Sequence, residues 1–330
     1  MNGPLIGRIA AGALGAYVLV CLVLAFLWSY EPDLFDVEAR ATARAEALGR
    51  QRVTGFTTTS TLIDIADTLL DKRGGYLSND IFPPGVLLDN TPNWEFGVLV
   101  QVRDMARVMR NDLSRSQSQS AENPDLANAE GKFFFDNSSW LFPQSEDEYR
   151  DGIRLLERYL RQMSDPTRQD AQFYARADNL RAWLQTVETR LGSLSERLSS
   201  AVGKRQLDMG LAGDPVAQQA TPSAEESDVK TPWLEIDDVF YEARGQTWAL
   251  IHLLRAAETD FGDVLRNKNA MISMRQIIRD LEPTQDTLWS PMVLNGDGLG
   301  VLANHSLVMA SHVARANAAI IDLRNLLSEG

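Results

Sequence analysis

The sequence predicts an all-α protein, with one N-terminal transmembrane helix followed by a soluble, bundle-like domain of several helices. Three observations support this fold class. An uninterrupted apolar run lies near the N-terminus, long segments carry apolar residues every three or four positions, and alternating strand patterns are almost absent. Hydrophobic residues make up 44 % of the 330 residues, which is enough apolar material for a substantial core.

The apolar run covers residues 9–28 and contains no charged side chain. At about 1.5 Å per residue, a helix of this length spans about 30 Å, the hydrocarbon thickness of a bilayer. Trp28 and Tyr30 fall at its far boundary, where amphipathic rings are enriched. A cleaved signal peptide is the alternative, but it has a shorter apolar core and a small-x-small cleavage site, which residues 25–30 lack. We therefore expect an uncleaved anchor in contact with the lipid bilayer.

The charges that flank this run indicate its orientation. Arg8 precedes it, whereas four acidic residues follow it before the first basic residue, Arg40. Because basic residues are retained on the cytoplasmic side, we expect residues 1–8 in the cytoplasm and the bulk of the chain in the periplasm. This places the protein in the inner membrane as a single-pass protein. The opposite topology, with the domain in the cytoplasm, remains an alternative because Arg40 and Arg44 oppose the bias.

The first part of the soluble region divides into a stalk, residues 29–56, and a first helical half, residues 57–203. Residues 37–50 are rich in Ala, Glu and Arg and can continue as a stalk helix. Within the half, apolar periodicity predicts helices over Thr57–Lys72, Asn93–Ser116, a segment that starts at Ser145, and Asp170–Val202. The last of these has near-heptad spacing, which is typical of a helix packed lengthwise in a hairpin.

Residues 204–231 change in character and carry Gly, Pro, Gln and acidic residues without apolar periodicity, so we expect a flexible linker. A second helical half, residues 232–330, follows and is expected to pack on the first. Its predicted helices are Glu235–Leu265, Ala270–Leu281 and Val301–Leu327.

Composition excludes several classes of function. The 32 basic residues are outnumbered by 45 acidic ones, a net charge of −13, which argues against nucleic-acid binding. One cysteine and three histidines cannot form a cysteine-rich metal cluster, and we expect no cofactor and no metal. The sequence has no nucleophile elbow and no phosphate-binding loop. Whether the protein is an enzyme stays open.

Titratable residues on helices offer two weaker candidates. Asp64, Asp67 and Asp71 form one stripe that could bind a cation or hold an acid with a raised pKa, but such a stripe is more often a solvated face. His305 and His312 lie about 10 Å apart along a helix, which is too far to share one metal. His252 lies in an apolar helix and is predicted to be a packed, hydrogen-bonded residue.

The most unusual segment is residues 79–110, where prolines, charges and a tryptophan meet at a loop-to-helix junction. A tryptophan beside charged groups in such a place is typical of a docking surface. The commoner alternative is a buried turn whose aromatic side chain anchors the start of the helix. The candidate surface for a partner or ligand consists of Asp80, Asp89, Asn90, Trp94, Glu95 and Arg103.

Four stretches of sequence carry a family resemblance. They read GGYLSND (74–80), PPGVLLDN (83–90), PNWEFGVL (92–99) and RNDLSRSQSQS (110–120), and SPMVLNGD (290–297) is similar in kind. Together they resemble family number 2333 of the bacterial domains of unknown function. The resemblance covers nearly the whole chain and implies a bacterial inner-membrane protein with one N-terminal span. It implies no activity and no catalytic residue.

These observations favour an envelope interaction or scaffold module that binds a protein partner and can form oligomers. A carboxylate-based enzyme or small-ligand binder, with a cleft near Asp80, Asp89 and Glu95, is the alternative. A flat apolar surface would favour the module, and a pocket of carboxylates with perturbed pKa values would favour the alternative.

Overall fold

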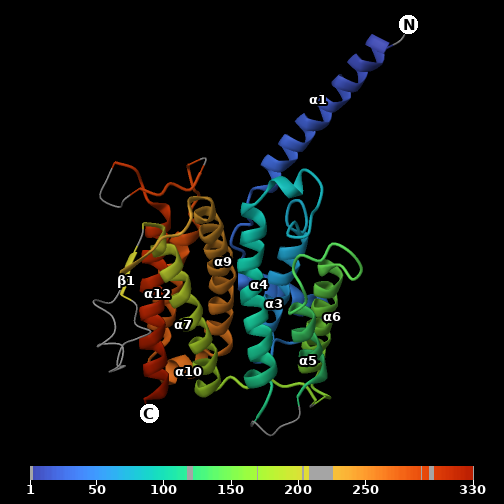
Figure 1. Cartoon of the computed structure of the whole chain (residues 1–330). Helices are drawn as coiled ribbons and strands as arrows, with labels where there is room; N and C mark the ends of the chain where they lie inside the picture. Colours follow the sequence, from blue (N-terminus) through green and yellow to red (C-terminus); the bar gives the residue numbers. More distant parts are fainter. Residues whose placement is uncertain are drawn as a thin grey trace, which may run out of the picture.

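The computed structural model describes residues 3–116, 122–168, 170–202, 204–207, 226–290, 292–296 and 301–329 (Figure 1). It confirms the all-α prediction. Within these ranges, the only paired strands are β1 (Lys204–Leu207) and β2 (Glu226–Val229), which form a short antiparallel ribbon. Both strands belong to the predicted linker, and residues 208–225 of that linker lie outside the described residues.

Helix α1 (Gly3–Trp28) projects from one end of the helical body and points away from it (Figure 1). Its segment Gly7–Trp28 is long and apolar enough to cross a membrane, and only 6 % of the most apolar window is buried against the chain. The anchor prediction is thus compatible with the fold, as is a signal sequence. We call the end from which α1 emerges the proximal end, and the opposite end, where the C-terminus lies, the distal end.

The predicted stalk 29–56 is wrong as a separate unit, because its helix is part of the domain. Helix α2 (Val37–Leu48) buries Val37, Ala41 and Ala45 and packs on α3 and α9. These residues recur every four positions, so a narrow stripe of small side chains allows close approach to the core. The Ala, Glu and Arg composition concealed this stripe.

The helices form two groups, and most of them run up and down between the two ends (Figure 1). One group comprises α2, α3 (Phe56–Asp71), α4 (Asn90–Val108), α5 (Pro124–Phe133) and α6 (Ser145–Met163). The other comprises α7 (Ala177–Ser199), α9 (Ile236–Asp260), α11 (Met271–Leu281) and α12 (His305–Ser328), with the short α10 (Gly262–Asn267) at the distal end. Short helical turns join them: η1 (Gly85–Leu87), the π-helical η2 (Met109–Leu113), η3 (Ser200–Val202), η5 (Trp233–Glu235) and η6 (Glu282–Gln285).

The boundary between the two groups lies between α6 and α7, and not in the predicted linker. Helix α7 packs lengthwise against α12, as its near-heptad spacing suggested, so it joins the group that follows it in sequence. One continuous hydrophobic core includes residues of both groups, and the two predicted halves therefore form a single body.

Helices α4 and α9 form the seam between the groups, and two glycines allow their close approach. A Cβ atom on Gly97 would lie 2.7 Å from the Gln246 backbone nitrogen and closer still to the Glu242 carbonyl oxygen. A Cβ atom on Gly245 would lie 2.9 Å from the Trp94 carbonyl carbon. Backbone therefore touches backbone on both sides of this crossing, which leaves no space for any other residue type.

Several predicted helix ends shift. Helix α4 begins at Asn90 with the Asp89 carboxylate as its cap, not at Asn93, because Pro92 fits the first turn, where its missing N–H is not needed. Residues 170–176 are not helical, so α7 begins at Ala177. The predicted Glu235–Leu265 helix breaks at Phe261, and α12 starts at His305 behind its cap Asn304. Helix α5 was not predicted.

Candidate functional site

The predicted surface around Trp94 is instead part of the interior. Trp94 is buried and packs on Trp248 of α9, with 5.3 Å between the ring centroids. Its ring lies at the α4–α9 seam, so it anchors the start of α4 and is not available to a partner. The alternative of a buried, anchoring aromatic residue is the one that the structure supports.

Glu95 is also buried, and it organises the loop that follows α3. Its carboxylate pairs with the Lys72 ammonium group and accepts hydrogen bonds from the backbone N–H groups of Leu77 and Ser78, both at 2.8 Å. The Ser78 hydroxyl donates a further hydrogen bond to it. Burial raises the pKa of Glu95, while Lys72 and these hydrogen bonds oppose that shift. Every acceptor position of this carboxylate therefore serves the fold.

The remaining four predicted residues have separate positions. Asp89 accepts a hydrogen bond from the backbone of Asn90 and starts α4. Arg103 donates to the carbonyl oxygens of Phe133 at 2.7 Å and Phe135 at 2.8 Å, and so closes the end of α5. Asp80 is largely exposed. Partial desolvation of its carboxyl group, together with the nearby charge of Glu146, raises its pKa. The carboxylates of Asp80, Asp89 and Glu95 thus do not combine as the free groups of one cleft.

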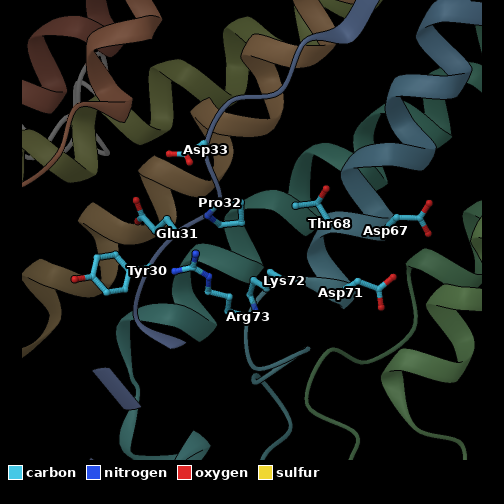
Figure 2. Close-up of a pocket in the computed structure, with 9 residues that line it drawn as sticks. All are labelled: Tyr30, Glu31, Pro32, Asp33, Asp67, Thr68, Asp71, Lys72 and Arg73. Atoms are coloured by element: carbon cyan, nitrogen blue, oxygen red, sulfur yellow. The ribbon is translucent and has the colours of Figure 1, made fainter. Parts of the chain in front are cut away.

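A pocket of about 450 Å³ lies nearby, at the foot of α1 (Figure 2). One wall is the chain that leaves α1, and the other is the last turn of α3 with the two residues after it. The lining residues are Tyr30, Glu31, Pro32, Asp33, Asp67, Thr68, Asp71, Lys72 and Arg73. Two members of the predicted acidic stripe, Asp67 and Asp71, therefore line this pocket, with their carboxylates directed away from residues 30–33 on the opposite wall (Figure 2).

The acidic stripe is not the simple solvated face that was predicted. Asp64 is buried and pairs with Arg44 of α2, and Asp71 pairs with Arg150 of α6 at 2.7 Å. Asp67 lies 3.9 Å from Arg44, too far for a hydrogen bond. Desolvation raises the pKa of Asp67 to about 6, because the charges of Asp64, Asp71 and Glu157 reinforce the effect and Arg44 only partly offsets it. A carboxyl group with this pKa can exchange a proton near neutral pH.

Two buried, charged side chains near the pocket, Arg244 and Lys72, were not predicted from the sequence. Arg244 of α9 is buried and pairs with Glu31, with 2.7 Å between Nε and the carboxylate. It also donates to the carbonyl oxygens of Thr284 and Asp286, at 3.0 Å and 2.9 Å. Arg244 is the only arginine among the mostly apolar residues 243–254, and this was the available signal in the sequence. Lys72, at the predicted helix end, gave none.

His252 is the packed, hydrogen-bonded residue that was predicted. His252 is fully buried, and its Nε2 accepts the backbone N–H of Phe35 at 3.0 Å while Nδ1 contacts the Trp248 carbonyl oxygen at 2.7 Å. Burial lowers its pKa to about 3, so it stays neutral and acts as a structural joint between α9 and the chain after α1. Within the described ranges, no group of three His, Cys, Asp or Glu side chains could hold a metal ion.

A neutral substitution at Asp67 is expected to stabilise the protein in a pH-dependent way. The raised pKa means that the folded protein favours the protonated acid, so the carboxylate costs stability as pH rises from about 4 through about 6. Asp67→Asn should therefore gain about 1 kcal/mol at pH 7.5, a figure reduced for the side chain's partial exposure, and nothing near pH 4. Thermal unfolding of the full chain in detergent at both pH values measures this. An equal gain at both would contradict the assignment.

Comparison with known proteins places the whole chain in one family. A bacterial family described as "Uncharacterized protein conserved in bacteria (DUF2333)" matches residues 5–330. The chain belongs to the DUF2333 family. No curated protein and no solved structure matches it. The resemblance inferred from residues 74–120 is thus confirmed. Membership of DUF2333 shows a shared sequence and implies no activity.

Proposed function

We propose that this DUF2333 protein is an inner-membrane scaffold or interaction module, with its helical domain in the periplasm. The observation that carries the proposal is the rigid junction between α1 and the body. Glu31 pairs with Arg244, the Trp248 indole donates to the Asp33 carbonyl at 3.3 Å, and the Phe35 backbone bonds His252. Trp28, the last residue of α1, lies against Gly74.

This junction favours an anchor over a cleaved signal sequence. The chain leaves the apolar helix and enters the core within a few residues, since Phe35 and Val37 are buried. A signal peptidase needs a site with small residues, which residues 25–30 do not offer. An apolar helix held rigidly on a helical body fixes how the body faces the membrane, which is useful to a scaffold.

Partner binding is tested by purification from detergent-solubilised membranes after cross-linking in cells. The matched control carries residues 1–30 fused to an unrelated soluble domain, so that it shares the membrane helix alone. We expect a protein that the full chain enriches and the control does not. Equal protein content in both samples would contradict the interaction module.

The pocket at the foot of α1 supports a second candidate, a binder of small ligands. The observation that favours it is Asp67, whose raised pKa and position in the pocket are typical of functional sites. Native mass spectrometry of the purified full chain should then show a bound small molecule that is lost in Asp67→Asn. The same mass for the chain before and after denaturation would reject this candidate.

The topology is tested with reporters at the C-terminus. A reporter that is active only in the periplasm should be active, and one that fluoresces only in the cytoplasm should be dark, because Arg8 is the basic residue next to the span. Retaining a flanking arginine is favoured because its passage through the bilayer centre costs about 2.5–3.5 kcal/mol on insertion scales. Arg8→Glu should weaken the bias. The reverse reporter pattern would move the domain to the cytoplasm and end the envelope proposal.

A further inference from the structure

The exposed large apolar side chains of the helical body concentrate at its proximal end. Four connections meet there, residues 72–89, 134–144, 230–235 and 282–304, as far as the structure describes them (Figure 1). They carry Trp289, Phe142 and Phe82, which are 94 %, 90 % and 73 % exposed. Among the described residues of the distal connections and adjacent helix ends, only Val53 and Ile272 are exposed large apolar residues. Exposed apolar residues scattered singly are normal, but this one-sided distribution is not.

We infer that an apolar rim at this end, formed by Phe82, Leu87, Trp233, Trp289, Val301 and Leu302, lies in the interface of the bilayer that α1 enters. All six side chains are more than half exposed. The inference rests on the proposed membrane anchor and adds a second contact with the lipid, made by the body itself. The domain is then seated on the membrane surface and is not held away from it.

The position of α1 identifies lipid as the occupant of this rim. Gly74, in the connection that carries Phe82 and Leu87, packs against Trp28 at the end of α1. Arg244 holds Glu31 to α9 and also binds the carbonyl oxygens of Thr284 and Asp286, just before Trp289. The parts of the rim in connections 72–89 and 282–304 are thus fixed to the chain where it leaves the apolar helix. Wherever α1 enters a bilayer, these side chains are brought to the same surface.

The charges of the rim specify the type of lipid contact. Connections 72–89, 230–235 and 282–304 contain six acidic residues and three basic ones, Lys72, Arg73 and Lys230, and Lys72 is already paired with Glu95. Their net negative charge does not favour anionic headgroups, which attract a polybasic surface. Tryptophan and phenylalanine instead partition into the interfacial region through their apolar area and ring dipoles. The contact should therefore occur on zwitterionic lipid and gain nothing from anionic lipid.

The test uses the full chain in phosphatidylcholine nanodiscs, with the native cysteine replaced as Cys21→Ser. A fluorescent probe is attached to a cysteine introduced as Phe82→Cys or Trp289→Cys. Ile272→Cys is the matched control, because Ile272 is 81 % exposed but lies at the distal end, near α10. Leu22→Cys reports on α1. The lipids carry a quencher either near the headgroup or deep in the acyl chains.

We expect headgroup-level quenchers to reduce the emission from positions 82 and 289 by half or more, and to leave position 272 unchanged. Deep quenchers should act mainly on position 22. Adding phosphatidylglycerol should not increase quenching at the rim. Quenching at position 22 without quenching at positions 82 and 289 would overturn the rim but not the membrane anchor. Shielding of the two rim probes by protein counts in the same way, because protein and not lipid would then cover the rim. No quenching at position 22 overturns the membrane anchor as well.

Discussion

Glu95→Ala is expected to destabilise the protein by about 3–5 kcal/mol, the usual cost of removing one partner of a buried ion pair. The substitution leaves the buried Lys72 ammonium group unpaired and deprives the backbone of Leu77 and Ser78 of its acceptor. For a chain of this size, this corresponds to a fall of roughly 10 °C in the unfolding temperature. Circular dichroism of the full chain in detergent measures it.

Two further variants separate the buried charge from the packing around it. Lys72→Met combined with Glu95→Gln removes both charges, and should recover much of the loss because no uncompensated ion remains. Arg150→Ala breaks the exposed pair with Asp71 at the same end of the body, and should cost less than about 1 kcal/mol. Equal losses for Glu95→Ala and Arg150→Ala would show that Glu95 is not the centre of this loop.

Gly97→Ala is expected to have an effect of similar size, about 3 kcal/mol or more, through the seam between α4 and α9. The added Cβ atom meets backbone atoms of Glu242 and Gln246, which cannot rotate away, so the helices must separate. Gly245→Ala should act in the same way against Trp94, and the two effects should not add, because the first substitution already opens the crossing.

Gly131→Ala is the matched control for this prediction. Gly131 lies within α5 with no atom within 4 Å of the added Cβ position. Alanine there should stabilise the protein by about 0.5–1 kcal/mol through helix propensity alone. The seam as described would be refuted if Gly97→Ala had the same stabilising effect.

Most helices could be predicted from the sequence, and their errors have local causes. Helices α3 and α11 begin and end within a residue or two of the predicted limits, and α6 begins at the predicted Ser145, because strong apolar periodicity coincides with clear end signals. Helix α5 is short and was missed, although Asn123 followed by Pro124 is an N-cap signal in the sequence. Helix α2 was assigned to a stalk because small buried alanines resemble a solvated face.

The candidate site was harder to predict, because its properties depend on pairs that are distant in sequence. Glu95 and Trp94 were singled out as parts of a docking surface, but a sequence cannot show that Glu95 pairs with Lys72 and that Trp94 packs on Trp248. The same holds for Asp67, whose pKa reflects burial and the charges of several helices. The apolar rim follows from the up-and-down order of the helices, which brings the three connections that carry it to one end.

That order also sets a distance from the membrane. With the rim on the bilayer, α12 leads away from the lipid, and its 24 residues are about 36 Å long at 1.5 Å per residue. The distal connections, which are poor in exposed apolar side chains among the described residues, and the C-terminus lie at the far end of this helix. A partner that binds there is held at a fixed height above the membrane, so the helical body would act as a rigid spacer.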